Sequence, residues 1–188
     1  MTTEAILSIF LGVGLAASVG FRVFVPLFAL SLASYFNVWE LNESWQWVGS
    51  LTAVITLGVA TIVEIFAYYI PLVDNLLDSI AMPLAAIAGT AVMVSTVADL
   101  SPVITWALAI IAGGGTAAAI AGTSSVARVA STTTTGGLGN PIVSTAETGT
   151  SIVMAGISLF VPVLGFILVI FLLFIIFRLY KKFKTTKA

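Results

Sequence analysis

Residues 122–150, GTSSVARVASTTTTGGLGNPIVSTAETGT, form a polar stretch between two long apolar segments. The stretch is rich in Ser, Thr and Gly, and Arg128 and Glu147 are its charged residues. A stretch of this kind is either a loop in water or irregular backbone held within a membrane by the rest of the protein. Because it lacks the run of charges typical of a solvated loop, we interpret it as the polar interior that apolar helices surround.

The composition of the whole chain is typical of an integral membrane protein. Of its 188 residues, 60% are hydrophobic and 8% are charged, and its mean hydropathy is +1.17. A soluble domain contains about 25% charged residues, so this chain is expected to contact the lipid bilayer. We predict an all-α polytopic bundle of about five or six membrane spans, formed by residues 1–188 as a single domain.

The residue counts exclude several classes of function. The chain has no Cys and no His, which removes disulfides, thiolate metal sites, thiol nucleophiles and the commonest general base. Its net charge of −1 argues against a nucleic-acid partner. The sequence therefore predicts no catalytic residue and favours a function other than catalysis.

The order of apolar and charged segments predicts a topology. Basic residues after the last apolar segment favour a cytoplasmic C-terminus, with 179–188 as a basic tail. The acidic, Trp-rich first loop is then expected outside, although another count of crossings makes this loop cytoplasmic. If the first loop is outside, the halves 1–100 and 101–178 each contain three crossings, which suits an inverted repeat. The expected spans are 48–70, 82–98, 103–121 and 151–177, with 5–36 interrupted near Arg22 and 122–150 as a broken crossing.

The segment 20–26, GFRVFVP, interrupts the first apolar run. Pro26 disfavours helix at Val25, and Arg22 is a permanent cation beside this break. The segment is either a break within one crossing or the start of a short re-entrant helix. In both cases a helix N-terminus beside Arg22 makes an anion site. The alternative is that Arg22 snorkels to headgroups or pairs with a carboxylate for structure alone.

Three acidic residues lie in or beside the second apolar segment. Glu64 is about 9 Å inside the end of its predicted span, so its carboxylate is expected to face the bundle interior or a cavity, either as a coupling group or as an ion-pair partner. Asp74 and Asp78 share one helix face and could hold a hard cation such as Mg²⁺ or Na⁺. An amphipathic turn at the membrane interface is the favoured alternative for this pair.

Residues 132–141, TTTTGGLGNP, are not expected to form an ordinary lipid-facing helix. Irregular backbone at membrane depth is tolerated only where protein buries it or a cavity wets it. The polar side chains of Thr133 and Asn140 would then line a polar pathway. The alternative is a mobile loop that lies wholly in water.

The chain resembles a family of bacterial integral-membrane proteins catalogued as domain of unknown function 4126. The resemblance lies in GFRVFVP at 20–26, VE at 63–64, PLVD at 71–74 and the stretch from Arg128 to Glu147. The resemblance covers most of the chain and implies a multi-pass protein of the bacterial inner membrane. The motif Arg22-x-Phe24-x-Pro26 is also similar to a fragment of the DedA lipid-carrier transporters, which combine re-entrant helices with buried acidic and Arg residues. The further Arg that follows the Pro in the DedA pattern is missing here.

We predict a membrane transporter or flippase that moves a small or lipid-linked anionic substrate, coupled to protons or Na⁺. The predicted substrate ligands are the polar side chains beside the broken helices: Arg22, Arg128, Thr133 and Asn140. The predicted coupling groups are the membrane-embedded carboxylates Glu64 and Glu147.

Two other classes of function stay open. One is a metal-dependent enzyme in which Asp74 and Asp78 hold the metal and Glu64 acts as a base. The other is a structural or assembly subunit whose charges are locked in ion pairs. Apart from Na⁺ or Mg²⁺ no cofactor is expected, and association into a homo-oligomer stays open.

Overall fold

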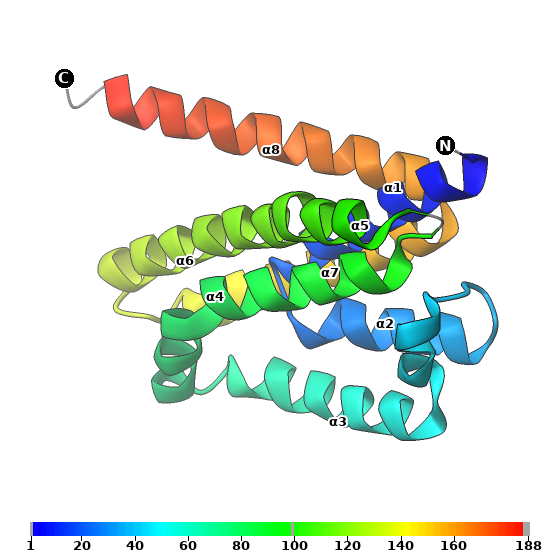
Figure 1. The fold of residues 1–188 in the computed structure, drawn as a ribbon. Coiled ribbons are helices and arrows are strands. Elements are labelled where there is room, and N and C mark those ends of the chain that lie inside the picture. The colour runs from blue at the N-terminus through cyan, green and yellow to red at the C-terminus, as the bar shows by residue number, and fades with distance from the viewer. Residues whose placement is uncertain (1, 99, 186–188) are drawn as a thin grey trace.

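The computed structural model describes residues 2–98 and 100–185, and within these ranges the chain folds into helices joined by short turns, without a β-strand. The helices lie side by side along a common direction, with α8 along one side of the bundle (Figure 1). The predicted all-α bundle is confirmed. The elements are α1 (Thr3–Val19), α2 (Phe24–Tyr35), the 3₁₀-helix η1 (Glu43–Gly49), α3 (Leu51–Ala67), α4 (Pro71–Thr96), α5 (Pro102–Leu108), the π-helix η2 (Ala109–Gly114), α6 (Gly115–Thr135), α7 (Asn140–Phe160) and α8 (Pro162–Thr185).

Within the described residues, four helical segments are long and apolar enough to cross a membrane: Val73–Thr96, Pro102–Thr135, Asn140–Phe160 and Pro162–Lys182. The elements η1 and α3 meet at 65° and add a fifth span if they cross the membrane together. Helices α1 and α2 are apolar but shorter. The chain is therefore a multi-pass membrane protein, and its apolar outer surface contacts the bilayer.

Helices α1 and α2 form a hairpin that begins and ends at the same end of the bundle. Near the start of α1, the Ser8 hydroxyl accepts a hydrogen bond from the backbone amide of Ala98, after α4 (3.1 Å). After α2, the Trp39 indole donates to the carbonyl of Leu159, near the end of α7 (2.8 Å). We call this the loop end, and the end with the α6–α7 turn and the C-terminal part of α8 the tail end (Figure 1). The chain therefore reverses direction between α1 and α2 instead of continuing as one broken crossing (Figure 1). A re-entrant helix after Arg22 stays a prediction.

The stretch 122–150 forms the adjoining halves of two long helices, so the expected irregular backbone within the membrane is wrong. Helix α6 continues to Thr135, and α7 begins at Asn140. The threonine hydroxyls are satisfied within the helix, because those of Thr133 and Thr134 donate to carbonyl oxygens four residues earlier, at 3.0 and 2.7 Å. A run of threonines is therefore compatible with regular helix here.

The turn between α6 and α7 depends on two glycines. Gly136 and Gly137 have φ values of 64° and 90°, in the left-handed region that ends helices and that other residues adopt at a cost. The turn is at the tail end of the bundle (Figure 1). The polar stretch therefore reaches from the bundle interior to this end rather than across the membrane.

Helix α4 begins at Pro71 and is longer than the predicted span. Proline is favoured in the first turn of a helix, where its missing N–H leaves no carbonyl unsatisfied. Asp74 and Asp78 consequently lie in the first turns of a long helix. Their position in an amphipathic turn at the membrane interface stays a prediction.

Helix α1 is central and packs against α4, α7 and α8. Ser18 and Ser151 join α1 to α7 by reciprocal hydrogen bonds: each hydroxyl donates to the other residue's carbonyl oxygen, at 2.7 and 3.0 Å. Small side chains at such crossings let the helices approach closely. This contact holds the end of α1 against the part of α7 that contains Glu147.

The predicted basic tail is a continuation of α8, which reaches Thr185. Its last lysine, Lys187, lies outside the described residues. The cytoplasmic location of the tail and the inverted repeat of 1–100 and 101–178 stay predictions.

Candidate functional site

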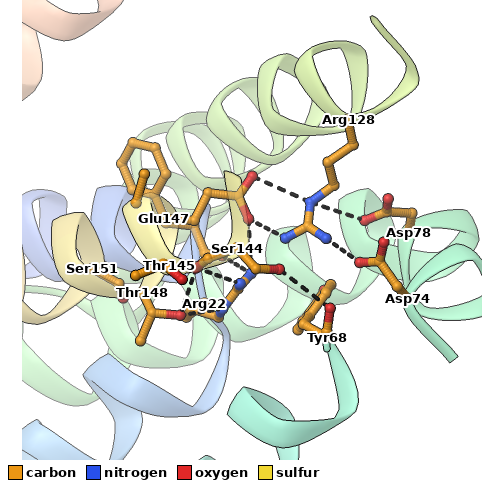
Figure 2. A network of polar contacts seen from close by, with 12 residues as sticks. Arg22, Tyr68, Asp74, Asp78, Arg128, Ser144, Thr145, Glu147, Thr148 and Ser151 are labelled. Carbon is orange, nitrogen blue, oxygen red and sulfur yellow. Dashed lines mark hydrogen bonds and ion pairs between the residues drawn. The ribbon is translucent and has the colours of Figure 1, made fainter. Parts of the chain in front are cut away.

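Five charged side chains converge inside the bundle toward its tail end (Figure 2). We call this set the charged network. Four of its members are 6% exposed or less, and the side chain of the fifth, Asp78, is 20% exposed. The members come from the α1–α2 break, α4, α6 and α7: Arg22, Asp74, Asp78, Arg128 and Glu147.

Arg22 reaches α7 from the break between α1 and α2. Its Nη1 contacts Glu147 Oε2 at 2.9 Å, its Nη2 donates to the Ser144 carbonyl at 2.9 Å, and its Nε donates to the Thr148 hydroxyl at 3.0 Å. The break itself lies close to α6, since a Cβ added to Gly20 would be 2.6 Å from Ile120 Cβ. The interruption predicted at 20–26 thus turns the Arg22 side chain into the bundle.

Arg128 on α6 contacts three carboxylates. It forms close ion pairs with Asp74 and Glu147, and its Nε is 3.5 Å from Asp78 Oδ1. The guanidinium therefore joins α4 to α7 through α6. A buried arginine that has carboxylate partners on two sides is far less costly than an isolated charge at membrane depth.

Glu147 is the carboxylate shared by both arginines. Its Oε2 contacts Nη1 of Arg22 and Nη2 of Arg128, and its Oε1 accepts from Nε of Arg128 at 3.3 Å. Loss of this negative charge would leave both guanidiniums short of a partner at once. Glu147 is therefore the carboxylate whose loss would affect the network most widely.

Tyr68, which the sequence analysis missed, lies against both arginines. The guanidinium carbons of Arg22 and Arg128 are 4.0 and 4.3 Å from the centre of its ring, which is cation–π geometry. Tyr68 follows α3 directly and precedes α4. An aromatic residue at the end of a span is common at membrane interfaces, so no local signal distinguished it.

Glu64 is separate from the charged network. Its Oε1 accepts from the backbone amide of Val23 at 2.8 Å and its Oε2 from that of Phe24 at 2.9 Å. The helix N-terminus predicted beside Arg22 is present, and the anion that it holds in this structure is the protein's own carboxylate. Two backbone N–H groups and the positive end of α2 compensate the charge of Glu64.

The predicted polar ligands Asn140 and Thr133 have different positions. The Asn140 amide donates to Asp74 Oδ2 at 3.0 Å and to the Thr132 hydroxyl at 3.1 Å, so it extends the charged network toward the tail end. Thr133 is exposed, and its hydroxyl donates to carbonyls of its own helix. The structure does not bring Thr133 to the network.

Asp74 and Asp78, the candidate metal ligands, both face Arg128. In the part of the chain that the structure describes, no group of three or more acidic, His or Cys side chains is arranged to hold a metal ion. The role of this pair in binding Na⁺ or Mg²⁺, and with it the metal-dependent enzyme, stays a prediction.

The network contains more negative than positive charge. Three carboxylates, Asp74, Asp78 and Glu147, face the two guanidiniums of Arg22 and Arg128. Among the described residues, every buried side-chain nitrogen or oxygen has a hydrogen-bond partner. The arrangement is thus saturated with internal bonds and still has one negative charge in excess when all groups are ionised. Uptake of one proton would neutralise it.

Comparison with known proteins identified one family. The model of a family described as a domain of unknown function (DUF4126) matches residues 9–182. Neither the curated proteins nor the solved structures gave a match. The resemblance noted from the sequence motifs is therefore confirmed for this family, and the similarity to the DedA transporters stays a prediction.

Proposed function

Because the chain belongs to this family, whose description assigns no activity, we propose from the charged network that it is a membrane transporter or flippase for an anionic substrate. The substrate binds to Arg22 and Arg128, and the coupling ion is a proton taken up by Glu147. The protein stabilises the substrate-free state by placing its own carboxylates on the two arginines. Glu64 has a secondary part, since protonation there would loosen the start of α2.

The shared carboxylate of Glu147 is the observation that supports this proposal. When Glu147 is ionised, both arginines are occupied and an external anion finds no free donor. When Glu147 is protonated, its hold on both guanidiniums weakens and an anion can replace it. Proton uptake by Glu147 therefore strengthens anion binding, and anion binding strengthens proton uptake to the same extent. Coupled transport requires this reciprocal effect.

The cost of burying the network favours transport over a purely structural role. Buried ion pairs stabilise a protein weakly, and well-packed apolar residues often replace them without loss. Ionisable residues within membrane spans are accordingly a mark of substrate or ion pathways. The α1–α2 hairpin brings Arg22 into the bundle beside a helix N-terminus, and transporter sites are typically built from interrupted helices of this kind.

A structural or assembly role is the second candidate, because every buried polar side chain among the described residues is already satisfied. A locked network and a transport site in its substrate-free state have the same contacts. They differ in what happens when an anion and a proton are supplied. The test must therefore measure flux.

The test uses the protein reconstituted in vesicles that contain a pH-sensitive dye. Inorganic phosphate, a short-chain carboxylate and an anionic lipid are supplied in turn, and acidification of the lumen is followed. The wild type is expected to move protons with at least one of these anions, and Glu147→Gln should lose the proton movement. Glu43→Gln is the matched control, because Glu43 is exposed and outside the network. Equal traces for Glu147→Gln and wild type would refute the role of Glu147. Na⁺-dependent flux without acidification would reassign the coupling ion.

A further inference from the structure

A groove of about 390 Å³ lies between α6, α7 and α8 on the outside of the bundle. All three helices belong to segments that are long and apolar enough to cross a membrane, so the groove faces the bilayer. Several residues that line it are exposed, among them Ala127 on α6 and Ala146 on α7. Glu147 lines it too, and it is the one member of the charged network that does. The groove therefore provides a route from the bilayer to the carboxylate that both arginines share.

Both arginines bind residues that form the wall of this groove. Nη1 of Arg22 donates to the Phe21 carbonyl at 3.1 Å and contacts Glu147 Oε2 at 2.9 Å, and Phe21 and Glu147 both line the groove. Arg128 follows the lining residue Ala127 and binds both oxygens of the Glu147 carboxylate. Figure 2 shows this carboxylate between the two guanidiniums. An anion that replaced it from the groove would therefore meet both positive charges.

The rest of the lining is suited to an apolar chain. Bulky apolar side chains from all three helices contribute to it: Ile120, Ile142, Leu172 and Ile176. On α7 the lining extends from residue 142 to residue 150, which corresponds to about 12 Å of helix. Ser124 lies four residues before Arg128 on α6, and its hydroxyl, which has no hydrogen-bond partner among the described residues, can bind an oxygen of a charged group.

We propose that the substrate is an anionic amphiphile that enters the network sideways from the bilayer through this groove. Its apolar chain lies along α6, α7 and α8, and its charged group takes the place of the Glu147 carboxylate between Arg22 and Arg128. The inference rests on the proposed transport function and narrows its substrate class from small or lipid-linked anions to anions with an apolar chain. A small hydrated anion is disfavoured, because it would lose its water along an apolar lining.

The first test is binding of decanesulfonate to the protein in phosphatidylcholine nanodiscs, with empty nanodiscs as the measure of partition into lipid. Ethanesulfonate has the same charged group without the chain, and decyltrimethylammonium has the same chain with the opposite charge. Decanesulfonate is expected to bind more tightly than either by about tenfold or more. Equal binding of decanesulfonate and decyltrimethylammonium would overturn the assignment of the groove to an anion.

Groove-filling variants locate the chain. In Ala127→Phe and Ala146→Phe the new ring occupies the groove, and exclusion of about two methylene groups from it should weaken decanesulfonate binding by about tenfold. Ala130→Phe is the matched control, because Ala130 is exposed on α6 and lies outside the groove. Unchanged binding in both groove variants would overturn the location.

Chemical labelling of the wild-type protein needs no variant. Dicyclohexylcarbodiimide reaches carboxyl groups from the bilayer: the protonated carboxyl gives its proton to one nitrogen, its oxygen bonds to the central carbon, and the acyl group then moves to the other nitrogen, with nothing released. Mass spectrometry should locate an adduct on Glu147 that decanesulfonate reduces several-fold and ethanesulfonate does not. No adduct on Glu147, or one that decanesulfonate leaves unchanged, would overturn the route through the groove.

Failure of this inference and failure of the proposed function give different results. If ethanesulfonate or inorganic phosphate drives proton movement in the vesicle assay while decanesulfonate does not bind, the amphiphile inference fails and the proposed transport function stands. If no anion, amphiphilic or small, is bound or moved, both fail.

Discussion

At the scale of single residues, the charged network is arranged around one carboxylate and one aromatic ring. Glu147 is shared by Arg22 and Arg128, and Tyr68 lies against both guanidiniums. The two arginines, which are 106 positions apart in the chain, are therefore linked both through a carboxylate and through a ring. A substitution of Glu147 or Tyr68 should therefore remove a contact from both arginines.

Replacement of Tyr68 tests the contribution of the ring. Tyr68→Phe keeps the aromatic face and should unfold close to the wild type. Tyr68→Leu removes two cation–π contacts and should lower the free energy of unfolding by about 1–2 kcal/mol. Thermal unfolding in detergent measures both variants under the same conditions. Equal destabilisation by Phe and Leu would show that the hydroxyl, which both variants lack, contributes and the π face does not.

The sequence was sufficient to identify most charged residues of the site but not their pairing. Arg22, Glu64, Arg128 and Glu147 stand out because ionisable groups are costly among apolar segments. Which carboxylate each arginine contacts depends on how α1, α4, α6 and α7 pack, and the local pattern contains no information on that. Glu64 was expected to face the interior, and its actual partners, two backbone amides of α2, could be known only once the hairpin was seen.

At the scale of helices, two elements hold the network in place: the α1–α2 hairpin and the α6–α7 hairpin. The first depends on Glu64, which binds the amides at the start of α2. The second depends on the turn at Gly136 and Gly137. The stretch 122–150 was misread because Ser, Thr and Gly are usually taken as helix-breaking, whereas here the hydroxyls bind carbonyls of the same helix. These bonds satisfy the hydroxyls, and the packing of α6 and α7 against α1 and α4 stabilises the helices.

Alanine substitutions at two glycines separate conformational from steric effects in the α6–α7 hairpin. Gly136 has φ 64° and no atom within 4 Å of an added Cβ, so Gly136→Ala should destabilise by about 1–2 kcal/mol through the left-handed conformation alone. Gly149 on α7 is equally open but has an ordinary helical φ, so Gly149→Ala should be neutral or stabilising by up to about 1 kcal/mol. Chemical denaturation in mixed micelles measures both. Equal effects of the two substitutions would mean that the turn does not require its positive φ.

At the scale of the whole molecule, the helix order defines two ends with different chemistry. The loop end contains the Trp-rich segment and the start of α1, while the tail end contains the α6–α7 turn and the basic end of α8 (Figure 1). The α1–α2 hairpin makes the start of α1 and the first loop share one end. The sequence could not decide this, because the apolar run 5–36 is long enough for more than one arrangement.

Cysteine labelling tests this topology, and the native chain contains no cysteine that would interfere. Cysteines introduced at Leu138, in the turn at the tail end, and at Asn42, at the loop end, should react with a membrane-impermeant thiol reagent from opposite sides of the membrane. Ile111, exposed within a membrane-length helix, is the control position and should not react from either side. Labelling of Leu138 and Asn42 from the same side would mean that the two ends of the bundle do not face opposite compartments.

The central claim is that the charged network exchanges a carboxylate for an anion as it takes up a proton. Calorimetry counts the protons taken up when the purified protein binds the anion that the vesicle assay identifies. The titration is repeated in buffers with different enthalpies of protonation. The account predicts uptake of about one proton per anion for the wild type and for Glu43→Gln, and none for Glu147→Gln. Anion binding with no proton uptake in the wild type would contradict it, because the arginines would then be free without protonation of Glu147.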